Sequence, residues 1–414
     1  MTTQIRPPSE ESVSETPASA VPGWTAFLDG LRDLPDRILA RLPADQAADP
    51  QLRQEAGRLA LSALVAGGLD ALASDPDYPA FVPQISNYIT LGQPNADTNY
   101  RSVKIAPGGV YRLRGRHGSM NQARVAESGP RPKQVEGTVN LGAPRPVHDL
   151  NALTVDGEGR YDVILSPARP KDWTGDWWRL DPTTNALLVR LVGSKWGEEI
   201  EPTLSIERLD VPASRPRPSA EALEEKLQSI AVSAGFIAPL LVDRPQKLRA
   251  EGYVHSLKGV DFSQMGGLTG QFYYEGAYEL EDDEALILET PLPETYTYRS
   301  LILTSDLYET IDWYNNHSSL NGAQDVVDAD GLLRVVVSAR DPGVPNWLDT
   351  AGYRTGVIQG RWVDSSSTPI PTVRKVALAD VRKFLPAATP VVGPEDRDRR
   401  VRDRRAALQQ RPLW

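Results

Sequence analysis

The stretch Ala186-Leu-Leu-Val-Arg-Leu-Val192 concentrates large aliphatic and β-branched residues, which favour strands, and it follows the turn pair Asp181-Pro182. Three further runs with strand-like patterning lie in the same part of the chain. They are Val110-Tyr-Arg-Leu-Arg114, Tyr161-Asp-Val-Ile-Leu165 and Leu204-Ser-Ile-Glu-Arg-Leu209. Glycine and proline separate these runs. Residues 85–211 are therefore predicted to form a first β domain, an antiparallel sandwich or jelly roll rather than alternating strands and helices.

Short aliphatic runs return further along the chain and predict a second β domain over residues 269–384. The expected strands are Ala285–Leu288, Arg299–Leu303, Leu332–Val337, Val357–Val363 and Val373–Leu378. The fold class predicted from both regions is mainly β with a helical N-terminal segment (α+β), built around two jelly-roll or β-sandwich-like domains.

Helical patterning surrounds the first β region. Within a helical segment predicted over 23–84, one helix is expected to begin near Trp24 and to be ended by Pro35. The clearest helical spacing of leucine and alanine covers residues 51–73. Residues 212–268 are predicted to be a proline-containing linker and a helix that Ser219 caps.

The two ends of the chain are strongly polar. Residues 1–22 are predicted to be a disordered leader without an apolar signal region, and no run of about 18 apolar residues is found, so a cytoplasmic location is expected. Residues 385–414 form a charged tail in which acidic and basic residues alternate. This pattern favours a solvated helix or a frayed end over a nucleic-acid-binding arm.

Composition excludes several classes of function. The formal net charge is -10 and the chain has no cysteine. An acidic chain argues against nucleic acid and against an anionic membrane surface as partners. Thiol chemistry and thiolate metal sites are excluded. The phosphate-binding glycine motifs and the Gly-x-Ser-x-Gly elbow are absent, so no cofactor is expected. The four histidines, His117, His148, His255 and His317, show no metal-binding spacing, so no metal site is assigned.

Three stretches together resemble a pair of bacterial families, the domains of unknown function numbered 1254 and 1214. Gln93-Pro-Asn-Ala-Asp-Thr-Asn-Tyr-Arg-Ser102 and the segment from Trp178 to Glu199 are similar to the N-terminal family. The segment from Asp330 to Arg354, with Asn346-Trp-Leu-Asp349, is similar to the C-terminal one. The resemblance covers roughly residues 85–380 and implies two jelly-roll-like β domains with extra helices, but no settled activity. Relatives often carry histidine where this chain has Tyr353.

The motif at 95–101 holds the densest group of short polar side chains beside an aromatic residue. Such side chains often bond their own backbone in turns, so one interpretation is a turn that leads into a strand. The functional interpretation makes Asp97 a general base or ligand anchor, with Asn95, Tyr100 and Arg101 as ligand-binding residues.

Further candidates lie outside this motif. Arg190 is placed by alternation on the face opposite Val189 and Leu191, where either a salt bridge to Glu199 or Asp97, or a bound carboxylate, would satisfy it. Trp196 is a possible ring platform. His317 is the histidine best placed to act as acid or base, and Tyr353 is the third catalytic candidate. Asn346, Trp347 and Asp349 form either a plug in the sandwich or a place where a ring stacks and a hydroxyl is bound.

The sequence thus predicts a β protein that handles a small polar, ringed molecule, a sugar or an aromatic acid. It would be a cofactor-independent acid/base enzyme, a hydrolase, lyase or isomerase. The alternatives are a non-catalytic, homo-oligomeric assembly protein and a divalent-metal enzyme of the cupin type.

Overall fold

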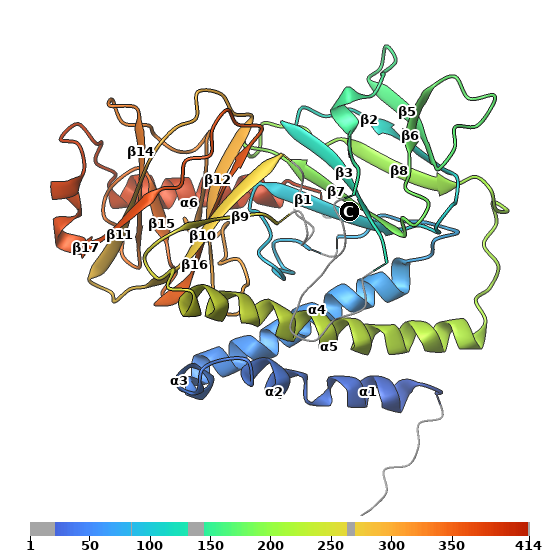
Figure 1. Cartoon of the computed structure of the whole chain (residues 1–414), viewed down its shortest axis with the longest axis horizontal. Helices are drawn as coiled ribbons and strands as arrows, with labels where there is room; N and C mark the ends of the chain where they lie inside the picture. Colours follow the sequence, from blue (N-terminus) through green and yellow to red (C-terminus); the bar gives the residue numbers. More distant parts are fainter. Residues whose placement is uncertain (1–20, 84, 131–144, 263–269, 413–414) are drawn as a thin grey trace, which may run out of the picture.

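The computed structural model describes residues 21–83, 85–130, 145–262 and 270–412. Two β units lie side by side above a layer of helices, and a C-terminal helix runs along the second unit toward the first (Figure 1). The fold is mainly β with a helical N-terminal segment, as the sequence predicted. The leader predicted at 1–22 lies outside the described residues apart from its last two.

The helical layer is built from short amphipathic segments that pack on two long helices. Asp49 caps the first long helix by accepting hydrogen bonds from two backbone N–H groups, and Ser219 caps the second by accepting one from Ala222. Pro35 begins a helix instead of ending one, because the first turn of a helix needs no N–H from it. The helices are α1 Trp24–Arg32, α2 Leu34–Leu39, α3 Ala44–Ala48, α4 Pro50–Ala73 and α5 Ala220–Ala250.

Helices α4 and α5 are both long and apolar enough to cross a membrane by length and composition. They pack against each other here, and together with α2 they bury a shared core that includes Leu59, Ala63 and Ala238. Core helices of soluble proteins pass the same test of length and composition.

The first β unit is a sandwich of two four-stranded sheets. Its core lies between the sheets and includes Tyr111, Val163 and Val189, all of them fully buried. The strand orders are β1-β7-β3-β4 and β6-β5-β2-β8. The strands are β1 Thr98–Lys104, β2 Tyr111–Arg116, β3 Gln122–Ser128, β4 Val147–Asp149, β5 Arg160–Ser166, β6 Asp176–Arg179, β7 Ala186–Val192 and β8 Thr203–Arg208.

The second β unit is a larger sandwich, with Tyr278, Leu303 and Trp362 in its core. Its sheets have the orders β13-β12-β16-β10-β9 and β15-β14-β11-β17. The strands are β9 Lys258–Val260, β10 Gln271–Glu279, β11 Glu284–Pro291, β12 Tyr298–Thr304, β13 Ser319–Asn321, β14 Leu332–Ser338, β15 Trp347–Asp349, β16 Thr355–Val363 and β17 Thr372–Ala377. The 3-10 turns η1 Leu150–Ala152 and η3 Leu378–Phe384 accompany the sheets.

The outer face of the five-stranded sheet is also covered over its central strands. Val192 of β7 packs there against Tyr298 and Val363, which joins the two units directly. Helix α5 covers another part, where Leu248 contacts the sheet. Strands β12 and β16 are therefore buried on both faces, and a polar residue on their outer face lies between the sheet and either the first unit or helix α5.

The C-terminal charged tail differs from its prediction as a solvated or frayed end. Helix α6, Pro394–Gln409, buries Arg397, Arg404 and Leu408 against the rest of the protein. These residues are spaced seven and four apart, so they share one face of the helix. The alternating charges concealed this face, because arginine can be buried when its planar guanidinium meets carbonyl oxygens and aromatic rings.

Candidate functional site

Asp97 lies at the junction of the two β units, in the turn that leads into β1, and is almost fully buried. Its Oδ1 accepts hydrogen bonds from Nε1 of Trp196, at 2.7 Å, and from Nδ2 of Asn321, at 2.8 Å. Its Oδ2 accepts one from the hydroxyl of Tyr298, at 2.5 Å. The donors come from both units, so the carboxyl group is held at the contact between them.

Asn95 completes this arrangement and confirms part of the turn interpretation. The backbone N–H of Thr98 donates to the carbonyl oxygen of Asn95, which closes the turn. The Asn95 side chain donates to the Thr98 hydroxyl at 3.0 Å and to the Tyr298 hydroxyl at 2.9 Å. Its backbone N–H donates to the hydroxyl of Tyr100 at 2.9 Å. The motif therefore fixes a turn and also carries side chains to the second unit.

Burial dominates the electrostatics of the Asp97–Tyr298 pair. It raises the pKa of Asp97 above its ordinary value, while the hydrogen bonds from Tyr298 and Asn321 and the charge of Arg411 act in the opposite direction. Burial, followed by the negative charge of Asp97, raises the pKa of Tyr298 well above its ordinary value. Tyr298 therefore stays protonated near neutral pH and serves as the donor of the pair.

Two arginines from the C-terminal segment enclose Trp196 beside this pair. Arg404 lies 4.6 Å and Arg411 5.0 Å from the centre of the indole ring. Arg404 also donates to the carbonyl oxygen of Trp313 and the hydroxyl of Ser319, and burial lowers its pKa to about 10. The ring that the sequence suggested as a ligand platform is thus covered by guanidinium groups of the same chain.

The polar layer continues from Asp97 across the outer face of the five-stranded sheet. Cross-strand pairing sets Asn321 opposite Ser300, Ser300 opposite Arg361 and Arg361 opposite Tyr273. Residues that are paired in this way point to the same face, with neighbouring Cβ atoms about 5 Å apart. One row of side chains therefore connects the Asp97 cluster to Arg361.

Arg361 is the charged side chain of this row, and little in the described chain compensates its charge. It is 6% exposed, its Nη2 donates to Oε1 of Gln359 at 2.6 Å, and its guanidinium lies 5.2 Å from the ring centre of Tyr273. Gln359 in turn donates to Oε1 of Gln93. Among the residues that the structure describes, no carboxylate is at ion-pair distance from Arg361, and its Nε has no hydrogen-bond acceptor.

Two other buried N–H donors close to this row also have no acceptor within the described chain. They are Nε2 of Gln93 and Nε of Arg244. Arg244 is paired with Glu275, which also accepts a hydrogen bond from Tyr308. Buried polar groups without partners are uncommon in native proteins, so a water or a ligand is expected to supply the acceptor for such a donor.

Arg101 and Arg190, which the sequence grouped with Asp97, do not contact its carboxyl group. Arg101 is buried beside Glu201, at 3.1 Å, and also donates to the backbone carbonyl of Pro412. Arg190 is on the expected face of β7, where the strand register sets it between Tyr100 and Arg124. Its proposed acidic partners are bonded elsewhere, because Glu199 accepts backbone N–H groups from the loop after β7.

His317 is a buried histidine held by backbone and aromatic contacts. Its Nδ1 is 2.5 Å from the carbonyl oxygen of Trp347, and the two rings are stacked. Burial, then the nearby charges of Arg404 and Arg397, lower the pKa of His317 well below its ordinary value. The ring is therefore neutral near pH 7. Arg397 lies 4.9 Å from the centre of the Trp347 ring.

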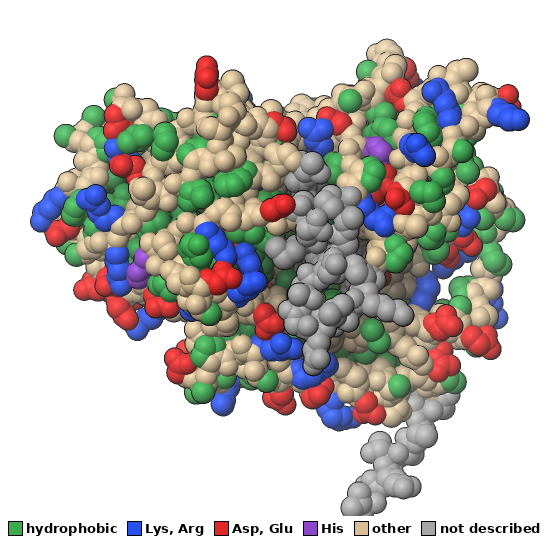
Figure 2. Space-filling view, in the orientation of Figure 1, with side chains coloured by type: hydrophobic (Ala, Val, Ile, Leu, Met, Phe, Trp, Pro, Cys, Tyr) green, Lys and Arg blue, Asp and Glu red, His purple; other side chains and the backbone are tan. Residues whose placement is uncertain are grey.

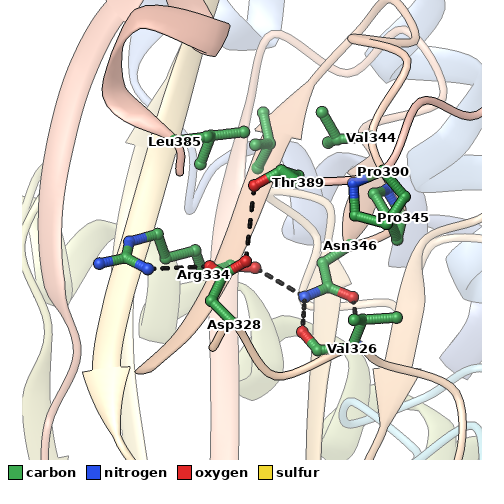
Figure 3. A pocket seen from close by; sticks show the side chains of 10 residues that line it. Val326, Asp328, Arg334, Val344, Pro345, Asn346, Leu385, Thr389 and Pro390 are labelled. Atoms are coloured by element: carbon green, nitrogen blue, oxygen red, sulfur yellow. Dashed lines mark hydrogen bonds and ion pairs between the residues drawn. The ribbon is translucent and has the colours of Figure 1, made fainter. Parts of the chain in front are cut away.

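Asn346 and Trp347 make the hydrogen bonds of structural residues. Both amide atoms of Asn346 bond to backbone groups of Val326, and Nδ2 also donates to the carbonyl oxygen of Arg334 (Figure 3). The hollow beside Asn346 has a volume of about 10 Å³, enough for one water. Nε1 of Trp347 donates to Ser338. These contacts favour the plug interpretation of the motif.

Asp349 and Tyr353 lie apart from the Asp97 cluster. Burial raises the pKa of Asp349 to about 6, and its Oδ1 caps the turn by accepting the N–H of Ala351. The hydroxyl of Tyr353 donates to Glu55 of helix α4 at 3.1 Å, and burial raises its pKa to about 12. Tyr353 thus connects the helical layer to the second unit.

A wide hollow lies on the first unit, away from this layer. It has a volume of about 710 Å³ and is lined by Arg114, Arg116, Arg160, Asp156 and Asp162 among others. These charges are largely neutralised by partners, for example Arg114 by Glu207. Acidic and basic side chains are also interspersed over the face of the molecule in Figure 2.

Several residues of the layer were missed in the sequence: Gln93, Tyr298, Asn321, Gln359, Arg361, Arg404 and Arg411. For β16 a signal existed. Gln359 and Arg361 alternate with Gly360 inside an otherwise apolar run, and polar residues at alternate positions of a buried strand indicate a polar face. The contribution of the tail had no comparable signal.

No family model matches the chain, and no curated protein matches it. Among solved structures, an uncharacterised protein from Burkholderia cenocepacia is similar, with 27% identity and a TM-score of 0.78 over 86% of this chain and 97% of that chain. A protein from Vibrio parahaemolyticus matches with 13% identity and a TM-score of 0.42 over 77% of this chain and 98% of that chain. The first match indicates that this β-rich architecture occurs in another bacterial protein.

Proposed function

We propose that the protein binds a small polar, ringed molecule in the polar layer on the outer face of the five-stranded sheet and acts on it by proton transfer, without a cofactor. The observation that carries this proposal is the group of buried N–H donors without acceptors in the described chain, on Gln93, Arg244 and Arg361, which the row of side chains on the outer face connects to the Asp97–Tyr298 pair. A layer that served only to join the units would gain stability from apolar side chains instead.

The two members of the pair suit different halves of a proton transfer. Tyr298, whose pKa burial holds far above neutrality, can donate a proton and take it back. Asp97, whose pKa burial raises above its ordinary value, can accept one. The positive charge of Arg361 acts on the Tyr298 hydroxyl and would stabilise a transient phenolate there. This is the chemistry of an isomerase or lyase.

An oligomeric assembly protein is the second candidate. Helix α4 exposes Leu61, Val65 and Leu72, which are 58%, 43% and 82% exposed. Their spacing of four and seven places them on one face of the helix. An apolar ridge of this kind favours association with another surface.

Native mass spectrometry of the freshly purified full chain tests the first proposal. A mass excess of small-molecule size that disappears on denaturation is expected. The same measurement on Tyr298→Phe should show a lower occupancy, whereas the control Tyr88→Phe, at a 60% exposed position, should match the wild type. A clean mass for the wild type, with a defined multimer that Leu72→Asp abolishes, would replace this proposal with the assembly function.

A further inference from the structure

We infer that Arg361 is the anion-binding residue of this layer and that the molecule it holds carries a single carboxylate next to a flat ring. The inference rests on the proposed function, because it names the class of ligand for the same site. It is carried by the juxtaposition of the Arg361 guanidinium, the ring of Tyr273 and the unmatched donor of Gln93.

The charges around Arg361 indicate that the ligand of this site is an anion. The buried arginines Arg101, Arg299 and Arg397 each have a carboxylate at 4.0 Å or closer. Arg361 has a comparable exposure but no such partner among the described residues. A buried charge without a partner is costly, so a site that keeps one is poised to receive the opposite charge from outside the chain.

The number of positive charges near Arg361 favours a carboxylate over a phosphate as the bound anion. The neighbouring cation, Arg244, is already neutralised by Glu275. Glu275 lies on β10, two residues after Tyr273, which is the residue paired with Arg361. Among the described residues, one positive charge at this end of the layer, that of Arg361, therefore remains without a carboxylate. A carboxylate carries one negative charge and two acceptor oxygens, which match the planar donors of an arginine.

The aromatic surroundings of Arg361 favour a ligand with a flat ring. Tyr273 is stacked beside the guanidinium, and Phe262 meets the Tyr273 ring edge-on at 4.9 Å. Ser300 and Asn321 continue the same row toward the Tyr298 hydroxyl and Asp97. A carboxylate on Arg361 would therefore direct the rest of the molecule along the row, to the pair that transfers protons.

Calorimetric titration of the full chain with sodium benzoate, benzamide and inorganic phosphate tests this inference. Benzoate is expected to bind, benzamide at least about tenfold more weakly because it lacks the charge, and phosphate no better than benzamide. In Arg361→Met, benzoate affinity should fall by about tenfold or more, and Arg361→Lys should restore part of it. Tighter binding of phosphate than of benzoate would overturn the carboxylate assignment.

A pair of matched variants separates a ligand-binding arginine from a structural one. Arg361→Met removes an uncompensated charge, so the melting temperature of the unliganded protein should stay equal or rise. Arg299→Met leaves Asp325 buried without its partner and should lower it. An equal loss of stability in both variants would make Arg361 structural and end the inference.

The outcomes also distinguish this inference from the proposed function. A neutral molecule found by native mass spectrometry, or equal binding of benzoate and benzamide that Arg361→Met leaves unchanged, would keep the proposed function and reject the anion site. Absence of a mass excess together with no binding of either probe would reject both.

Discussion

The hydroxyl of Tyr298 donates to Oδ2 of Asp97 at 2.5 Å across the junction of the two β units. The two residues are 201 positions apart in the chain. Each belongs to a different sandwich, and each is buried. A buried hydrogen bond to a carboxylate is stronger than one between neutral groups, so this contact couples the orientation of the units to the protonation of one side chain.

Tyr298→Phe should therefore destabilise the protein by about 1–3 kcal/mol, because Asp97 keeps its burial but loses one of its three donors. Equilibrium unfolding in urea, followed by tryptophan fluorescence, measures the loss. Tyr88→Phe, at an exposed tyrosine, should change the free energy of unfolding by less than about 0.5 kcal/mol. Equal stability of Tyr298→Phe and wild type would show that the bond contributes nothing to joining the units.

Arg404→Met should cost about 2 kcal/mol and should change the fluorescence of Trp196. The substitution removes the hydrogen bonds to the Trp313 carbonyl and the Ser319 hydroxyl, and it removes the cation above the indole ring. Arg402→Met lies on the exposed side of the same helix and is the control. If both variants lost the same small amount of stability, α6 would not hold the junction closed.

The sequence predicted the two β regions because their strands alternate or run apolar over short lengths between turn residues, and β7 was found with its observed bounds, Ala186–Val192. It missed β10, Gln271–Glu279, whose glutamates and glycine resemble a loop. Glu275 is buried next to Arg244, 31 residues earlier, which neutralises it, and Tyr308 also donates to it. Local patterns do not contain such a long-range pair.

Only part of the candidate site was predicted from the sequence, because its other residues are also brought together by long-range contacts. Asp97, Asn95 and Trp196 meet in the structure, since a dense polar motif beside an aromatic residue is visible in the sequence. Arg361 was hidden in an apolar strand, and its role depends on which groups reach it from β10, β12 and the loop at Gln93. Tertiary contacts, not composition, set these relations.

Asp349 should give the protein a stability that falls as pH rises from about 4 to about 6. Burial raises the pKa of Asp349 to about 6, whereas in the unfolded chain the carboxyl titrates near pH 4. The folded protein binds more protons in this window, so raising the pH favours the unfolded state until Asp349 is fully charged.

Asp349→Asn isolates this contribution, because the amide oxygen can still accept the N–H of Ala351 while the charge is absent. The variant should match the wild type near pH 4 and exceed its melting temperature at pH 7. Thermal unfolding of both proteins across this range provides the comparison. A wild type more stable than the variant at pH 7 would mean that the charged form of Asp349 is favoured in the folded protein, contrary to its burial.

Arg58 is expected to stabilise the protein by neutralising the carboxylate of Glu309. Glu309 is almost fully buried and accepts hydrogen bonds from Arg58, at 3.1 Å, and from Thr90, at 2.9 Å. Burial raises the pKa of Glu309 and the charge of Arg58 lowers it. Arg58→Ala would leave a buried carboxylate between α4 and the second unit with too few donors, and a loss of about 1–3 kcal/mol is expected.

Glu309→Gln in the Arg58→Ala background tests this reason, because it removes the charge that the first substitution leaves uncompensated. The double variant should recover about half or more of the loss, and a double-mutant cycle of urea unfolding measures the coupling. Arg53→Ala, on the exposed side of the same helix, controls for the loss of an arginine. Strictly additive effects of the two substitutions would mean that Arg58 acts through its packing on the helix and not through Glu309.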